Sequence, residues 1–265
     1  MSCNFWFLND KSSANQFNKR TNLEALFKIF PSPSELAEAF AEELTGRINI
    51  AGKSGLPFTL AVSGGNTPRL LFSILAEKYC SSVDWGNVQF FWVDERCVSP
   101  VDPESNFGMT KSILLDKIKI PGSNIHRIKG EDDPVKEAER YAQEILLHVR
   151  SEDQLPAFDQ VILGMGDDGH TASIFPGNLD LLRSENICEA SVHPLTGQRR
   201  ISLTGKVINN ADFITFLATG KNKAGIIEEI YNKKAQYMNY PASYIVPSRG
   251  VITWFIDEKA GELIK

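Results

Sequence analysis

The segment from Gly164 to His170, Gly-Met-Gly-Asp-Asp-Gly-His, combines a glycine-rich turn with groups that can transfer protons. Its three glycines remove side-chain bulk where the backbone must turn sharply and can approach a ligand. Asp168 and His170 are two residues apart, so their carboxylate and imidazole can converge on one small molecule. Histidine is also the side-chain type best suited to proton transfer near neutral pH. This turn is therefore predicted to be a functional site, with a core histidine held by backbone contacts as the alternative.

A metal site at the same turn is a weaker alternative. Asp167, Asp168 and His170 are acceptable ligand types, but no further histidine or cysteine cluster supports them. The other histidines lie outside the motifs and are expected to be incidental: His126, His148 and His193.

The segment Ser63 to Pro68, Ser-Gly-Gly-Asn-Thr-Pro, is a candidate phosphate loop between a strand and a helix. Gly64 and Gly65 let backbone N–H groups face an anion. Thr67 can cap the helix, and proline suits the first helical position. A helix N-terminus adds unpaired donors and the positive end of the helix dipole. The alternative is an ordinary strand–helix turn. The segment lacks the GK[ST] ending of a nucleotide-binding P-loop and the G-x-S-x-G frame of a serine hydrolase.

Further charged residues follow other predicted strands. Arg96 could bind a phosphate bidentately, and Asp94 could bind sugar hydroxyls or orient a base. Arg200 is another candidate cation, and one of the lysines in Thr219 to Lys223 could supply a point charge for phosphate. The alternative for each is a solvated surface charge.

These polar segments must be positioned by elements that alternate between strand and helix. Ser32-Pro33-Ser34-Glu35 is a capping box with proline at the first helical position, and it predicts a helix that continues through Leu44. Other helices are predicted at residues 69–78, 106–117, 134–150 and near 223–231. Strands are predicted at residues 25–30, 57–62, 88–93, 125–128, 161–163, 187–192, 200–203, 213–218 and 251–256.

This alternation predicts an α/β fold: a single domain with a mostly parallel, doubly wound, Rossmann-like sheet covered by helices on both faces. In such a sheet, ligands gather beyond the carboxyl ends of the strands, and three or four of the polar segments lie at such ends. The domain is expected to span residues 23–265, after a polar tail at residues 1–22, with a small subregion inserted near residues 180–200.

Composition restricts the partners. The 265 residues include 28 Lys and Arg against 33 Asp and Glu, a formal net charge of −5, so nucleic acid is not expected and an anionic substrate needs a local cationic pocket. No apolar run approaches the roughly 20 residues of a membrane span. The first 20 residues lack the features of a signal peptide, and the four cysteines form no CxxC pair. We expect a cytoplasmic monomer or weak homo-oligomer with a small-molecule partner and no membrane partner.

Together these segments resemble the 6-phosphogluconolactonase family, in the wider group that includes glucosamine-6-phosphate deaminases. After the histidine turn the chain continues Thr-Ala-Ser-Ile-Phe-Pro-Gly, as in the lactonases, and lacks the acidic residue that deaminases carry there. Arg96 also matches the lactonases, since deaminases tend to carry tyrosine at that place. The similarity covers roughly residues 23–260, and its matching pieces are residues 63–68, 94–96 with 105–106, 164–177, 200–204 and 220–223.

The resemblance implies a NagB-like fold and hydrolysis of 6-phospho-D-glucono-1,5-lactone to 6-phospho-D-gluconate in the oxidative pentose phosphate pathway, with no metal and no organic cofactor. A lactone is an activated ester, so water needs a general base and the carbonyl oxygen needs cationic or N–H donors. His170 is expected to be the base and Asp168 to orient it. The residues expected to bind the substrate and its phosphate are Ser63, Gly64, Gly65, Thr67, Asp94, Arg96, Asn106, Arg200 and Lys223.

Two other functions are alternatives. A sugar-phosphate isomerase or deaminase would use the same phosphate loop but abstract a proton from carbon, and the residues after the histidine turn count against it. A non-catalytic sugar-phosphate sensor would carry a DNA-binding module or a degraded catalytic turn, and neither is present in the sequence.

Overall fold

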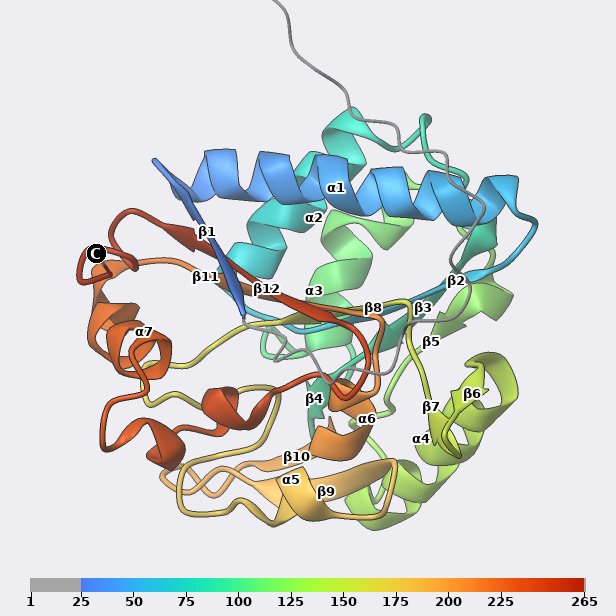
Figure 1. Cartoon of the computed structure of the whole chain (residues 1–265). Helices are drawn as coiled ribbons and strands as arrows, with labels where there is room; N and C mark the ends of the chain where they lie inside the picture. Colours follow the sequence, from blue (N-terminus) through green and yellow to red (C-terminus); the bar gives the residue numbers. More distant parts are fainter. Residues whose placement is uncertain (1–24, 265) are drawn as a thin grey trace, which may run out of the picture.

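The central sheet has seven parallel strands in the order β1-β12-β11-β8-β2-β3-β5 (Figure 1). The computed structural model describes residues 25–264. The strands, in sheet order, are β1 (Leu26–Phe30), β12 (Val251–Asp257), β11 (Phe213–Ala218), β8 (Gln160–Leu163), β2 (Phe58–Val62), β3 (Val88–Trp92) and β5 (Ile125–His126). The predicted strands and the predicted mostly parallel sheet are thus confirmed, although β5 is shorter than predicted.

Continuous apolar runs form the middle of this sheet because both of its faces are covered. Every residue of β2 and of β8 is buried. The polar members of these runs are paired: Thr59 donates to the Asp159 carboxylate at 2.6 Å, and Gln160 donates to the Thr215 hydroxyl at 3.1 Å. The edge strand β1 is only partly buried, as expected for a strand with one neighbour.

Helices cover both faces, with α1, α2 and α3 on one side of the sheet and α4 on the other (Figure 1). Their bounds are α1 (Pro33–Lys53), α2 (Asn66–Lys78), α3 (Asn106–Ile113), α4 (Pro134–His148), α5 (Asp180–Arg183), α6 (Gly205–Asn209) and α7 (Ala224–Tyr231). The predicted cap of the first helix is present, since the Ser32 hydroxyl accepts the Glu35 N–H at 3.2 Å. The Ser32 hydroxyl also donates to the Glu35 carboxylate at 2.7 Å.

Two helix boundaries differ from prediction. Helix α2 begins at Asn66 and not at Arg69, because Gly65 is its N-cap with φ 111°, so Thr67 is already helical and the prediction that it caps the helix is wrong. Gly65 has no side chain to occupy the first N–H groups of α2. Helix α3 ends at Ile113, and a separate 3₁₀ turn follows at Leu115–Lys117.

A second, antiparallel sheet supplements the helices on the α4 side of the molecule (Figure 1). Its order is β4 (Asp94–Arg96), β10 (Arg199–Leu203) and β9 (Cys188–Val192). The region predicted as an inserted subregion near residues 180–200 contributes β9 and the start of β10 to this sheet. The third strand, β4, directly follows β3. A two-stranded hairpin, β6 (Ser151–Glu152) and β7 (Leu155–Pro156), completes the strands of the described chain.

The sheet order reverses between β2 and β8. The chain runs from β2 to its neighbour β3 on one side, whereas it runs from β8 to β11 on the other. Crevices form at such a reversal, beyond the carboxyl ends of the strands. The histidine turn follows β8 and the candidate phosphate loop follows β2, so the fold brings the two together.

Among residues 25–264, no helix has the length and apolar character needed to cross a membrane. Cys80, Cys97 and Cys188 carry free thiols. The predicted tail at residues 1–22 lies outside the described residues.

Candidate active site

A cavity of about 400 Å³ lies beyond the carboxyl ends of four neighbouring strands, β11, β8, β2 and β3. Each strand contributes the segment that follows it, and β10 contributes one further residue. All the residues predicted to bind substrate line the cavity: Ser63, Gly64, Gly65, Thr67, Asp94, Arg96, Asn106, Arg200 and Lys223. His170 lines it as well, and Asp168 lies against the His170 ring.

The His170 ring is held by Asp168. Its Nδ1 lies 2.6 Å from Asp168 Oδ1, and the same oxygen accepts the backbone N–H of His170 at 3.1 Å. Because a carboxylate accepts, Nδ1 carries the proton of a neutral ring, which leaves the Nε2 lone pair free. Burial raises the pKa of Asp168, but the hydrogen bonds from His170 outweigh that effect and bring the pKa to about 2. The carboxylate is therefore a permanent acceptor at neutral pH.

The turn that carries this pair requires glycine at position 166. A Cβ atom there would lie 2.2 Å from the His170 ring and 2.8 Å from the Asp168 carboxylate. The backbone closes tightly around this point, since the Gly166 N–H donates to the His170 carbonyl at 2.9 Å. Gly166, one of the glycines predicted to allow close approach, thus makes room for the His170 and Asp168 side chains of its own turn.

One face of the antiparallel sheet supplies the positive charge. Alternate residues of a strand point to the same side, and Asp94 and Arg96 of β4 both line the cavity. Arg200 of β10 lies directly opposite Arg96 in the antiparallel register and lines the cavity too. Like charges opposite one another across a sheet are destabilising on their own.

The two guanidinium groups are incompletely paired. Among the described residues, the buried Nε atoms of Arg96 and Arg200 have no hydrogen-bond partner, although Arg96 Nη1 donates to the Glu104 carbonyl at 3.0 Å. Burial, followed by the charge of Arg96, lowers the pKa of Arg200. Unpaired donors and two adjacent positive charges in a cavity are the arrangement that an anion with several oxygens would satisfy.

Glu95 supports this charged surface from behind. It is 2% exposed and does not line the cavity, although it lies between Asp94 and Arg96 of β4, which do. Its carboxylate accepts the N–H groups of Arg96 at 2.7 Å, Asn106 at 2.8 Å and Phe107 at 2.8 Å. It also accepts the Ser105 hydroxyl at 3.1 Å, so it binds the first N–H groups of α3 and fixes that helix to β4.

Replacing Glu95 with glutamine is expected to lower the free energy of unfolding by about 1–3 kcal/mol, because the amide group would face N–H donors and leave them unpaired. Burial raises the pKa of Glu95 more than these hydrogen bonds lower it, so ionisation above that pKa costs stability, and the neutral amide avoids this cost. The expected loss is the cost of the unpaired N–H groups after this gain has been subtracted. The comparison is best made by urea unfolding at pH 7. The exposed Glu77→Gln serves as the control, with an expected change below about 0.5 kcal/mol. Equal stabilities of the two variants would contradict this role for Glu95.

The loop after β2 is shaped for close approach. A Cβ atom on Gly64 would lie 1.8 Å from Asn106 Oδ1, so the amide of Asn106 packs directly over this glycine. Asn106 in turn donates to the Asp94 carbonyl at 2.9 Å, which joins α3 to β4. The Thr67 hydroxyl makes a hydrogen bond of 3.0 Å with the Thr219 hydroxyl, and both residues line the cavity. The buried Ser63 hydroxyl has no partner among the described residues.

Lys223 is paired within the chain. Its ammonium donates to the Met165 carbonyl at 2.5 Å and to the Asp167 carboxylate at 2.8 Å. Asn222 donates to the same carboxylate at 2.6 Å, and the hydrogen bond from Lys223 is the main reason that the pKa of Asp167 is lowered. Lys223 is therefore one end of a clamp between the loops after β8 and β11.

Sequence reasoning missed the roles of Glu95, Asp167 and Asn222. A signal for Glu95 was available in the sequence. Side chains alternate between the two faces of a strand, so a residue between two cavity residues is expected on the other face. No local signal pairs Asp167 with Asn222, since 55 residues separate them. Within residues 25–264, the groups at this cavity do not include three side chains close enough to share a metal ion.

Comparison with known proteins identifies the family. The model of the family described as glucosamine-6-phosphate isomerases/6-phosphogluconolactonase matches residues 31–254. A 6-phosphogluconolactonase from Aggregatibacter actinomycetemcomitans is 41% identical over 236 residues, which cover 89% of this chain and 98% of that protein. The solved structure of devB protein is 40% identical with a TM-score of 0.86 and covers 91% of this chain and 100% of its own. That of 6-phosphogluconolactonase from Leishmania guyanensis is 28% identical with a TM-score of 0.82 and covers 91% and 99%. The chain belongs to the glucosamine-6-phosphate isomerase/6-phosphogluconolactonase family.

Proposed function

We propose that this protein hydrolyses 6-phospho-D-glucono-1,5-lactone to 6-phospho-D-gluconate. The observation that carries the proposal is that one cavity is lined by His170, whose ring Asp168 holds, and by two arginines with unpaired buried donors. A sugar-phosphate lactone has matching parts, an ester carbonyl that needs a base-activated water and a phosphate that needs cations. The relatives named 6-phosphogluconolactonase support the same substrate.

His170 acts as the general base in this proposal. Its Nε2 takes a proton from water as the water oxygen bonds to the lactone carbonyl carbon, and a tetrahedral oxyanion forms. Asp168 keeps the proton on Nδ1 and stabilises the imidazolium that results. When the bond from that carbon to the ring oxygen breaks, the imidazolium returns its proton to the ring oxygen, and the product is the open-chain acid.

The cations divide between the two ends of the substrate. We assign the phosphate to Arg96 and Arg200, whose two positive charges match a phosphate dianion. The oxyanion is then assigned to Lys223 and to the backbone N–H groups at the start of α2, which also line the cavity. We infer a cytoplasmic enzyme, for which the free thiols of the described chain are the support. We also infer a monomer or weak homo-oligomer.

The acid side of the pH profile of kcat, measured at saturating lactone, is expected to follow one ionisation of the enzyme. Because the pKa of Asp168 is lowered to about 2, its carboxylate is fully ionised above the ordinary Asp pKa near 4 and is protonated only as the pH falls toward 2. His170 must be neutral to accept a proton, so protonation of the ring lowers the rate with unit slope on a logarithmic plot. Initial rates between about pH 4 and 8, corrected for spontaneous hydrolysis, measure this slope. A slope of two would mean that a second group of the site takes up a proton in this range, and Asp168 would then not remain ionised as expected.

The function itself is tested by a coupled assay. Glucose-6-phosphate is oxidised to generate the lactone, and 6-phosphogluconate dehydrogenase reports the hydrolysed product with and without this protein. A clear acceleration over spontaneous hydrolysis that resists EDTA is expected. No acceleration would refute the lactonase, and turnover of glucosamine-6-phosphate, followed by sugar-phosphate binding without turnover, would then identify the deaminase or the sensor.

A further inference from the structure

Three metal-binding side chains meet on the α4 side of the molecule, outside the active-site cavity. His126 lies at the end of β5, and Glu144 and His148 lie one turn apart near the end of α4. One nitrogen or oxygen atom from each lies within 4.8 Å of the other two. None of the three lines the cavity that contains His170. The proposed hydrolysis therefore gives this cluster no role.

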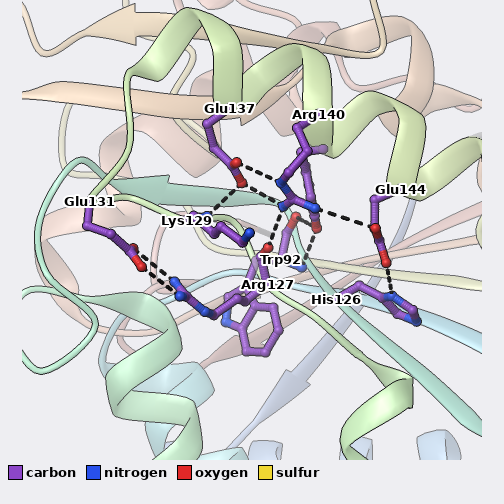
Figure 2. Close-up of polar contacts among 9 residues, drawn as sticks. Trp92, His126, Arg127, Lys129, Glu131, Glu137, Arg140 and Glu144 are labelled. Carbon is purple, nitrogen blue, oxygen red and sulfur yellow. Dashed lines mark hydrogen bonds and ion pairs between the residues drawn. The ribbon is translucent and has the colours of Figure 1, made fainter.

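The carboxylate of Glu144 occupies the centre of the cluster. Its Oε1 lies 2.7 Å from His126 Nδ1 and 3.5 Å from His148 Nε2. Its other oxygen, Oε2, lies 3.4 Å from Arg140 Nη1 (Figure 2). Arg140 is itself neutralised by Glu137, to which it donates two hydrogen bonds of 2.7 and 2.6 Å. The charge of Glu144 thus remains available to a cation at Oε1.

His126 faces more acceptors than a neutral imidazole can satisfy. Its Nε2 lies 2.7 Å from Gln89 Oε1, while its Nδ1 lies 2.7 Å from the Glu144 carboxylate. With the Gln89 oxygen facing the ring, a neutral imidazole, which has one N–H, points one lone pair at an oxygen lone pair. The side chain of His126 is 3% exposed, so solvent water does not relieve this conflict. A cation at Nδ1 removes the conflict.

We propose that His126, Glu144 and His148 bind a Zn²⁺ ion through Nδ1, Oε1 and Nε2. Two imidazoles and one carboxylate are ligands that Zn²⁺ favours over the oxygen-seeking Mg²⁺ and Ca²⁺. The side chain of His148 is 38% exposed, so water can complete the coordination from solvent. Gln89 and Arg140 then serve as outer partners, one accepting the Nε2–H of His126 and the other holding the free oxygen of Glu144.

Ligand atoms around a tetrahedral Zn²⁺ ion lie roughly 3.3 Å apart, given metal–ligand bonds of about 2.0–2.1 Å. Glu144 Oε1 lies 2.7 Å from His126 Nδ1 and 3.5 Å from His148 Nε2, so one distance is shorter and the other longer than this value. The two imidazole rings are 4.2 Å apart at an angle of 36°, so the surface residue His148 must rotate to direct its lone pair at the ion. The bound ion would join the edge strand β5 to α4 and stabilise the folded state.

The test is a calorimetric titration of Zn²⁺ into metal-stripped full-length protein at about pH 7.5, where the ligand groups can be deprotonated. It is made in the His170→Asn background, so that the active site does not compete for the ion. We expect one bound ion with a dissociation constant in the micromolar range or below, and a rise in Tm on binding. His148→Ala and Glu144→Gln are each expected to weaken binding at least about 10-fold, as the loss of a ligand should. The exposed Glu139→Gln on the same helix is the control and should bind as tightly as its parent.

Equal affinity in His148→Ala, Glu144→Gln and Glu139→Gln would overturn the proposal, because the ion would then bind elsewhere. The absence of saturable binding below about 100 µM would overturn it as well, since that corresponds to a binding free energy weaker than about 5.5 kcal/mol. In that case the amide nitrogen of Gln89 donates to His126 Nε2, and His126 donates from Nδ1 to Glu144. The proposed lactonase is unaffected by either result, because none of the three residues lines the cavity.

Discussion

Replacing His170 with asparagine is expected to lower the kcat/KM for 6-phospho-D-glucono-1,5-lactone by about 10²–10⁴-fold, the usual contribution of a general base. Asparagine is similar in size and can still hydrogen-bond, but its amide cannot accept a proton from water. The Asp168 carboxylate does not replace the ring, because it lies behind it, 2.6 Å from Nδ1, and does not line the cavity. The coupled assay measures this loss once spontaneous hydrolysis has been subtracted.

His193→Asn is the matched control for this variant. His193 lies beside the same phenylalanine as His170, since the centre of the Phe175 ring is 5.0 Å from that of the His170 ring and 4.8 Å from that of the His193 ring. Its Nδ1 accepts the backbone N–H groups of Leu195 and Thr196, which an asparagine oxygen can also accept. The control should keep near-normal activity. A near-normal rate in His170→Asn would remove His170 from the role of base, even if the protein remained a lactonase.

The fold was predictable because its main signals are local. Five-residue apolar runs such as Phe58–Val62 are buried along their whole length, and this is the pattern that a covered parallel strand requires. The order of polar segments after successive strands then predicted which loops share a cavity, since the carboxyl ends of parallel strands lie at one edge. His170, Asp168 and the nine residues predicted to bind substrate were selected in this way or through the family resemblance. The structure brings His170 and all nine to the lining of one cavity.

The remaining features depend on pairing between distant segments, which no local pattern encodes. Arg96 and Arg200 become cross-strand neighbours only because β4 turns away from the central sheet and pairs with β10. The clamp between Asp167 and Lys223 joins two loops 56 residues apart. His126 and His148 were expected to be incidental. They lie on different elements, β5 and α4, and no sequence pattern shows that the fold brings them together. Thr67 was a good capping residue by type, but the backbone conformation of Gly65 starts the helix before it.

Arg200→Met is expected to lower the kcat/KM for the phosphorylated lactone by about 10²-fold, or about 3 kcal/mol, as the loss of a charge-assisted hydrogen bond in a buried site should. The guanidinium of Arg200 lies opposite Arg96, and its buried Nε has no partner among the described residues, so an anion is the interaction it would lose. Methionine keeps much of the length and the apolar packing of the side chain. The neighbouring Arg199→Met is the matched control, because Arg199 is exposed and does not line the cavity.

Comparison of two substrates decides which end of the lactone Arg200 binds. Glucono-1,5-lactone has the same carbonyl and ring oxygen as the phosphorylated lactone but no phosphate. If Arg200 binds the phosphate, Arg200→Met will lose activity on the phosphorylated lactone and change little on the unphosphorylated one, so the ratio of the two kcat/KM values falls about 10²-fold. If Arg200 stabilises the oxyanion, both substrates will lose activity equally, since both pass through the same tetrahedral intermediate. Equal losses would therefore refute the assignment of the arginine pair to the phosphate and transfer that role to Lys223 and the N-terminus of α2.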